Sequence, residues 1–146
     1  LKHMIKSIHG LIAYLFLIST VTFVIFSLIS FLKKSDFRKT NMTLVKLAFI
    51  SSHLQLALGL LLWWSQGYLS QLSQDTKSVM GDKALRILAV EHPVTNILAI
   101  ALITIGFISI KKSAIDQTKH LKGIIYFGIA LLLILSRIPY HSWLNL

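Results

Sequence analysis

The chain has 146 residues, 55% of them apolar, with 15 Lys and Arg against 5 Asp and Glu and a formal net charge of +10. This apolar content exceeds that of an average soluble domain. The absence of cysteine excludes disulfides, thiolate metal sites, iron–sulfur clusters and c-type haem attachment. Because the basic residues lie between apolar runs, we expect no nucleic-acid partner.

Four apolar runs of about 20 residues follow in chain order, each long enough for an α-helix to cross a bilayer. They cover residues 10–32, 44–64, 87–110 and 123–140. The first run is too long for a cleavable signal and lacks a small-residue cleavage site, so we expect a membrane helix there. The sequence therefore predicts an all-α membrane protein with a single domain over residues 1–146, an antiparallel four-helix bundle surrounded by lipid.

Lysine and arginine residues are divided unequally between the two ends of this bundle. Six lie near the termini and in the longest connection, residues 65–86, which we expect to form a partly helical cap on the outer membrane surface. The other nine follow the first and third runs: Lys33, Lys34, Arg38, Lys39, Lys46, Lys111, Lys112, Lys119 and Lys122. The positive-inside rule therefore predicts a multi-pass protein with both termini on the outer side.

Histidines are the main candidate functional residues. An ionisable side chain within a membrane span is costly and is a functional-site candidate by default. His53 and His92 fall within predicted spans, and His9 and His141 flank two others. His120 lies among lysines and is expected to be solvated or to contact lipid headgroups.

A b-type haem is the first cofactor that this pattern suggests. It needs two neutral imidazoles across a slot between helices, apolar walls, and cations near the surface for its propionates. We expect His53 and His92 to be the axial pair, provided that helix tilt closes the gap in depth between them. His9 is the substitute ligand, and Arg137 is a cation at the outer end.

A divalent transition metal is the alternative cofactor. If Pro93 begins the third span, then His9, Glu91, His92 and His141 share one level at the outer face. Imidazole and carboxylate ligands suit zinc, copper or iron. A third reading has no cofactor at all, with the chain acting only as a structural subunit of an assembly.

Several segments resemble one known family. Residues 52–60 resemble an AHxQLxxGL segment, residues 89–92 and 99–106 resemble an AVEH…AIxLITIG segment, and Lys119-His120 and residues 138–140 resemble a KH pair and an IPW end. These segments are similar to small four-span proteins of Bacteroidetes-type bacteria that are labelled "cytochrome B". The resemblance implies a bacterial inner (cytoplasmic) membrane protein that carries haem b.

One position departs from that family. Its first span tends to open with a His-x3-Arg-like pattern, whereas Ala13 stands four residues after His9 here. A propionate-binding role for that arginine would therefore pass to Arg137.

The expected function is electron transfer between a quinol pool and an outer-face partner, or service as a small subunit of a larger redox complex. One haem does not carry electrons across a whole membrane. No Ser/His/Asp set or phosphate-binding loop occurs in the sequence. We therefore expect an electron-transfer or accessory subunit rather than a complete enzyme.

The charge bias gives a test of topology. A reporter that is active only in the cytoplasm should be silent when fused after Leu146 and active when inserted near Asp36, because nine cations lie on that side and six on the other. The reverse pattern of reporter activity would show that the bias does not set the orientation.

Overall fold

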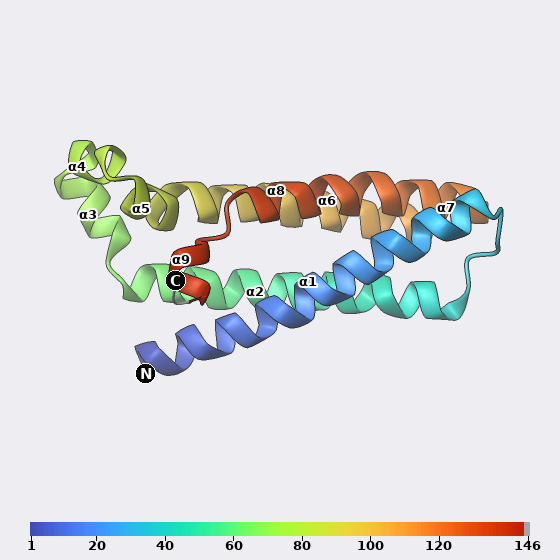
Figure 1. Cartoon of the computed structure of the whole chain (residues 1–146), viewed down its shortest axis with the longest axis horizontal. Coiled ribbons are helices and arrows are strands. Elements are labelled where there is room, and N and C mark those ends of the chain that lie inside the picture. The colour runs from blue at the N-terminus through green and yellow to red at the C-terminus, as the bar shows by residue number, and fades with distance from the viewer. Residues whose placement is uncertain (145–146) are drawn as a thin grey trace.

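The computed structural model describes residues 1–144, and within them the fold is all-α. Four long helical segments run antiparallel, as predicted, and place both termini at one end of the bundle (Figure 1). The first two are α1 (Lys2–Leu32) and α2 (Lys39–Ser65). The third joins α5 (Lys83–Arg86), a π-helical turn η1 (Ile87–Glu91) and α6 (His92–Lys112), and the fourth joins α7 (Asp116–Lys122), a π-helical turn η2 (Gly123–Phe127) and α8 (Gly128–Ser136).

All four segments are long and apolar enough to cross a membrane, so the prediction of a multi-pass membrane protein is confirmed. Their bounds differ from the predicted ones. The first helix begins at Lys2 rather than near residue 10, and the fourth ends at Ser136 rather than at residue 140. The early end has a local cause, because Pro139 has no N–H and disfavours helical backbone at the residue before it.

The connection between α2 and α5 is partly helical, as expected. It contains α3 (Tyr68–Gln74) and α4 (Thr76–Gly81). Gly67, the residue before α3, has a φ of +77°. Asp75 caps α4 by accepting a bond from Ser78 N, and Asp82 caps α5 by accepting one from Leu85 N. Carboxylates at helix starts satisfy free N–H groups and favour the positive end of the helix dipole. This cap lies at the same end of the bundle as the termini (Figure 1).

Aromatic and small residues alternate where the helices meet. Phe23 of α1 packs edge-to-face on Phe127, with ring centroids 4.9 Å apart. Close approach is possible because glycines face these rings: Gly123 lies against Phe23, and Gly106 lies against Tyr126. Membrane helices associate through such small residues, since lipid gives no hydrophobic drive for apolar side chains to meet.

Helix α1 crosses the bundle obliquely, and its N-terminal half diverges from α8 (Figure 1). The last helix, α9 (Tyr140–Leu144), folds back toward this part of α1. Its Trp143 ring lies 4.8 Å from the Tyr14 ring and also packs near Gly10. The divergence of α1 leaves space among the helices at the end that carries the termini.

Substitution of Gly106 tests this packing. A Cβ at Gly106 would lie 2.6 Å from Tyr126 Cβ, so Gly106→Ala should lower the free energy of unfolding by about 1–3 kcal/mol. Gly128→Ala is the matched control, because a Cβ there has no neighbour within 4 Å and alanine favours helix. Unfolding in detergent, followed by circular dichroism, measures both. Equal stability of the two variants would contradict the close approach of α6 and η2.

Candidate functional site

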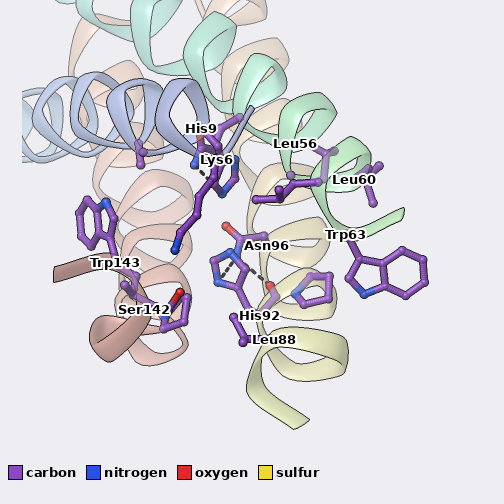
Figure 2. Close-up of a pocket in the computed structure, with 18 of the residues that line it drawn as sticks. Lys6, His9, Leu56, Leu60, Trp63, Leu88, His92, Asn96, Ser142 and Trp143 are labelled. Carbon is purple, nitrogen blue, oxygen red and sulfur yellow. Dashed lines mark hydrogen bonds between the residues drawn. The ribbon is translucent and has the colours of Figure 1, made fainter. Parts of the chain in front are cut away.

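A cavity of about 710 Å³ lies between the N-terminal half of α1, the second half of α2, the start of α6 and the region of α8 and α9. Its walls are mainly apolar and aromatic, with Tyr14, Trp63 and Trp143 among them. Its polar lining residues include His9, Gln55, His92 and Asn96, and Lys6 also lines it. Figure 2 shows the side chains of Lys6, His9 and His92 around one space. Such a volume and lining are typical of a small-molecule or cofactor site.

His9 is seated on α2. A Cβ at Gly59 would lie 3.1 Å from His9 Cε1, so the absence of a side chain at Gly59 makes room for the imidazole. One turn earlier on α2, Gln55 Nε2 lies 3.2 Å from His9 Nε2. Two buried atoms of this pair, His9 Nδ1 and Gln55 Oε1, have no hydrogen-bond partner. Buried polar atoms without partners are uncommon in folded proteins.

His92 is held by the end of the fourth helix. Its Nδ1 lies 2.9 Å from the carbonyl oxygen of Arg137. A carbonyl oxygen only accepts, so Nδ1 carries the proton in the neutral ring and Nε2 keeps its lone pair. Asn96 Nδ2 donates to the backbone oxygen of His92 at 2.7 Å and also lies 3.1 Å from His92 Nδ1. The shorter contact with the Arg137 carbonyl favours the tautomer in which the lone pair of Nε2 is free.

His9 and His92 are brought together across the cavity. Their ring centroids are 6.5 Å apart and their planes are nearly perpendicular, at 83°. With a metal–nitrogen bond of about 2.0 to 2.1 Å and about 1.1 Å from nitrogen to ring centre, two imidazoles that share one metal ion have centroids about 6.3 Å apart. That distance applies to imidazoles on opposite sides of a metal with one nitrogen of each directed at it. The observed separation matches it, but in this structure His9 Nε2 is directed at Gln55.

His53 does not belong to this pair, and the expected axial set of His53 and His92 requires correction. His53 Nδ1 lies 2.8 Å from Phe49 O, and Nε2 lies 3.3 Å from Thr104 Oγ1. Thr104 is 12 residues beyond His92 on α6, which corresponds to about 18 Å along the helix axis. Helix tilt does not close this gap, and the two rings do not reach a common ligand.

The four residues of the alternative metal site are not assembled. Both carboxylate oxygens of Glu91 are engaged, with Arg86 Nε at 2.7 Å and Arg137 Nε at 3.0 Å, and His141 is exposed on α9. Within residues 1–144, no three His, Asp or Glu side chains are placed to hold a metal ion. The geometry thus gives no support to a site that combines His9, Glu91, His92 and His141.

The cation at the cavity differs from the expected one. Arg137 pairs with Glu91, whereas Lys6 extends from α1 toward the space between Trp143 and His92 (Figure 2). Lys6 and His9 are three residues apart and so share a helix face, a spacing that is visible in the sequence. Sequence reasoning missed Lys6 because the first helix was expected to begin near residue 10.

His120 was also misjudged. It is fully buried rather than solvated, its ring centroid lies 5.0 Å from that of Phe37 with the planes tilted by 46°, and neither ring nitrogen has a hydrogen-bond partner. It lies in α7, at the end of the bundle away from the cavity. The flanking lysines suggested exposure, but Lys119 pairs with Asp116 and Lys122 bonds to Ser109 O and Ser113 Oγ, so both are partly buried beside it.

The turn that carries His92 is shaped by Pro93. Because proline has no N–H, it leaves the carbonyl of Ala89, four residues earlier, without its helical partner. Trp63 Nε1 donates to this oxygen at 2.8 Å, which joins α2 to η1 beside the cavity. The adjoining π-helical turn over Ile87–Glu91 offsets the helix by one residue just before His92, and such turns are frequent at functional sites.

Comparisons of the chain with protein-family models, with curated proteins and with solved structures found no match. The chemistry of the site therefore has to be inferred from its own groups. They are two imidazoles that line the same cavity, an apolar and aromatic enclosure, and one lysine at the rim. This set can ligate a planar metal-centred cofactor and hold an acidic group beside it.

Removal of the Trp63 indole N–H tests the turn. Trp63→Phe should lower the free energy of unfolding by about 1–3 kcal/mol, because the buried Ala89 carbonyl loses its donor. The adjacent Trp64→Phe is the matched control, since Trp64 is 68% exposed. In a Pro93→Ala background the cost of Trp63→Phe should shrink, because Ala supplies a backbone N–H to the same oxygen. An undiminished cost would contradict this role of Trp63.

Proposed function

We propose that the chain is a b-type cytochrome-like membrane protein that binds haem b in the cavity between His9 and His92. One observation carries the proposal: the two imidazoles line one largely apolar cavity of about 710 Å³, with their ring centroids 6.5 Å apart. Haem in membrane bundles is held by axial side chains from facing helices within apolar walls.

His92 is the anchored ligand in this proposal. The bond from Nδ1–H to Arg137 O sets the tautomer and raises the basicity of Nε2, as second-layer hydrogen bonds do for metal-bound histidines. Arg137 is in turn held by Glu91, which also pairs with Arg86. Arg137 therefore acts by fixing His92, and Lys6 takes the propionate-binding role that was expected of Arg137.

His9 is the more mobile ligand. In this structure its Nε2 contacts Gln55, so the ring has to turn away from Gln55 before a nitrogen points toward His92. The turn exchanges one polar contact for a metal bond, and the buried, unpartnered Nδ1 shows that the present arrangement is not fully satisfied. Gly59 leaves space for the ring on the α2 side.

A bound haem would supply one-electron chemistry at the end of the bundle that carries both termini. We assign that end to the outer side of a bacterial inner membrane. The partners would be a quinol and a redox protein, or a larger membrane complex. A site confined to one end suits an electron-transfer or accessory subunit rather than a complete enzyme.

Absorption spectra of protein from a haem-replete host test the proposal. The reduced protein should show a sharp Soret band and split visible bands of six-coordinate low-spin iron. His92→Ala should abolish haem binding, and His9→Ala should at least remove the six-coordinate spectrum, because each removes one axial bond. His53→Ala is the matched control and should leave the spectrum unchanged, since His53 does not line the cavity.

Two outcomes would overturn different parts of the proposal. A colourless protein that takes up no added haemin rejects haem binding and favours a structural assembly subunit. Loss of haem in His53→Ala together with its retention in His9→Ala rejects the ligand pair. Metal analysis of His141→Ala separates the remaining alternative, because only the four-residue metal site requires His141.

A further inference from the structure

The end of the bundle opposite the cavity carries a cluster of exposed cations. It is formed by the connection from α1 to α2 and by the connection from α6 to α7, which lie together at this end (Figure 1). The exposed cations, here called the basic end, are Lys33, Lys34, Arg38, Lys39, Lys46, Lys111 and Lys112. Lys119 and Lys122 belong to the same end but are partly buried.

Acidic side chains do not balance this charge. Only Asp36 and Asp116 lie in these connections. Asp116 is used internally, because it pairs with Lys119 at 2.8 Å and accepts a bond from Phe37 N at 3.0 Å. Among residues 1–144, no ion pair joins any of the seven cations of the basic end to an acidic side chain.

Helix stability explains only part of the cluster. Cations at the C-terminal ends of α1 and α6 interact favourably with the helix dipoles, which accounts for Lys33, Lys111 and Lys112. Arg38 and Lys39 stand at the start of α2, where the dipole disfavours positive charge, and the first turn has no acidic residue. Their charges therefore add to the cost of the start of α2 unless an external anion lies nearby.

Lys34 gives an independent indication. It adopts a φ of +51°, a left-handed conformation that glycine or asparagine accepts more readily than lysine. Lysine thus stands where the backbone favours glycine. No ion pair or hydrogen bond of the Lys34 side chain within residues 1–144 explains a lysine at this position.

We propose that the basic end binds the headgroups of anionic phospholipids in the leaflet that it faces. The seven cations emerge where α1, α2 and α6 leave the apolar core, which is the level of lipid phosphates. Clusters of four to eight Lys or Arg next to a membrane helix are typical of such binding. This inference does not depend on haem, because the basic end and the cavity lie at opposite ends of the bundle.

Titration of phosphatidylglycerol into the full chain in neutral detergent, read by native mass spectrometry, tests the proposal. The triple variant Lys33→Gln, Lys39→Gln, Lys112→Gln should bind the lipid roughly fivefold more weakly for each cation removed, and the difference should shrink at high salt. The matched control is Lys2→Gln, Lys77→Gln, Lys83→Gln, which removes three exposed cations at the other end. Phosphatidylcholine should bind all three proteins equally.

Lys34→Gly separates lipid binding from folding. It should weaken phosphatidylglycerol binding while holding or raising Tm in neutral detergent, because glycine accepts the positive φ without strain. The proposal is overturned if the control triple loses as much affinity as the basic-end triple. It is also overturned if wild type binds phosphatidylglycerol and phosphatidylcholine equally, in which case an acidic protein becomes the better candidate partner.

Discussion

Every backbone carbonyl within a bilayer needs a donor from the protein, because no water is present to supply one. The two prolines of the chain break this rule locally, and side chains repair it in both places. Pro93 leaves Ala89 O to the indole of Trp63, and Pro139 leaves Leu135 O to the hydroxyl of Tyr140. The carbonyl of Arg137, just past the end of α8, is satisfied by His92. The donors to these carbonyls are the aromatic and imidazole side chains of Trp63, Tyr140 and His92, which lie at the end of the bundle that holds the cavity.

Polar side chains in the middle of the spans also need hydrogen-bond partners from the protein, and most of them find these partners in their own helix. Ser19 and Thr20 bond to Phe16 O, Thr104 bonds to Ile100 O, and His53 contacts Phe49 O. Each uses a carbonyl of its own helix, so these groups can lie deep in the bundle without any ligand. His53 also reaches Thr104 of α6, and His92 contacts the Arg137 carbonyl at the end of α8. His9 and His120 both retain nitrogens without a partner, so what distinguishes His9 and His92 is that both line the cavity.

The four spans, the antiparallel order and the partly helical cap could be predicted from the sequence, because apolar length and connection composition determine them. The inward face of each helix could not, because side chains facing lipid and side chains facing other helices are both apolar. On α2 the buried positions include Ser52 and Gln55, so the inward face is centred one residue away from His53. Because each residue turns the helix by about 100°, an error of one residue in the inward face gives His53 different neighbouring helices. The sequence thus marked His9 and His92 as candidates, but it favoured His53 over His9 as the residue near His92.

The apolar run in α1, residues 10–32, is about 34 Å long, slightly more than the hydrocarbon core of a bilayer, which is about 30 Å thick. A helix with such positive hydrophobic mismatch responds by tilting, and α1 already crosses its neighbours obliquely (Figure 1). His9 is carried by the diverging half of α1, whereas His92 is tied to the end of α8. A thicker membrane would bring α1 closer to upright and change the spacing of the two imidazoles. Through the tilt of α1, bilayer thickness would therefore affect the distance between His9 and His92.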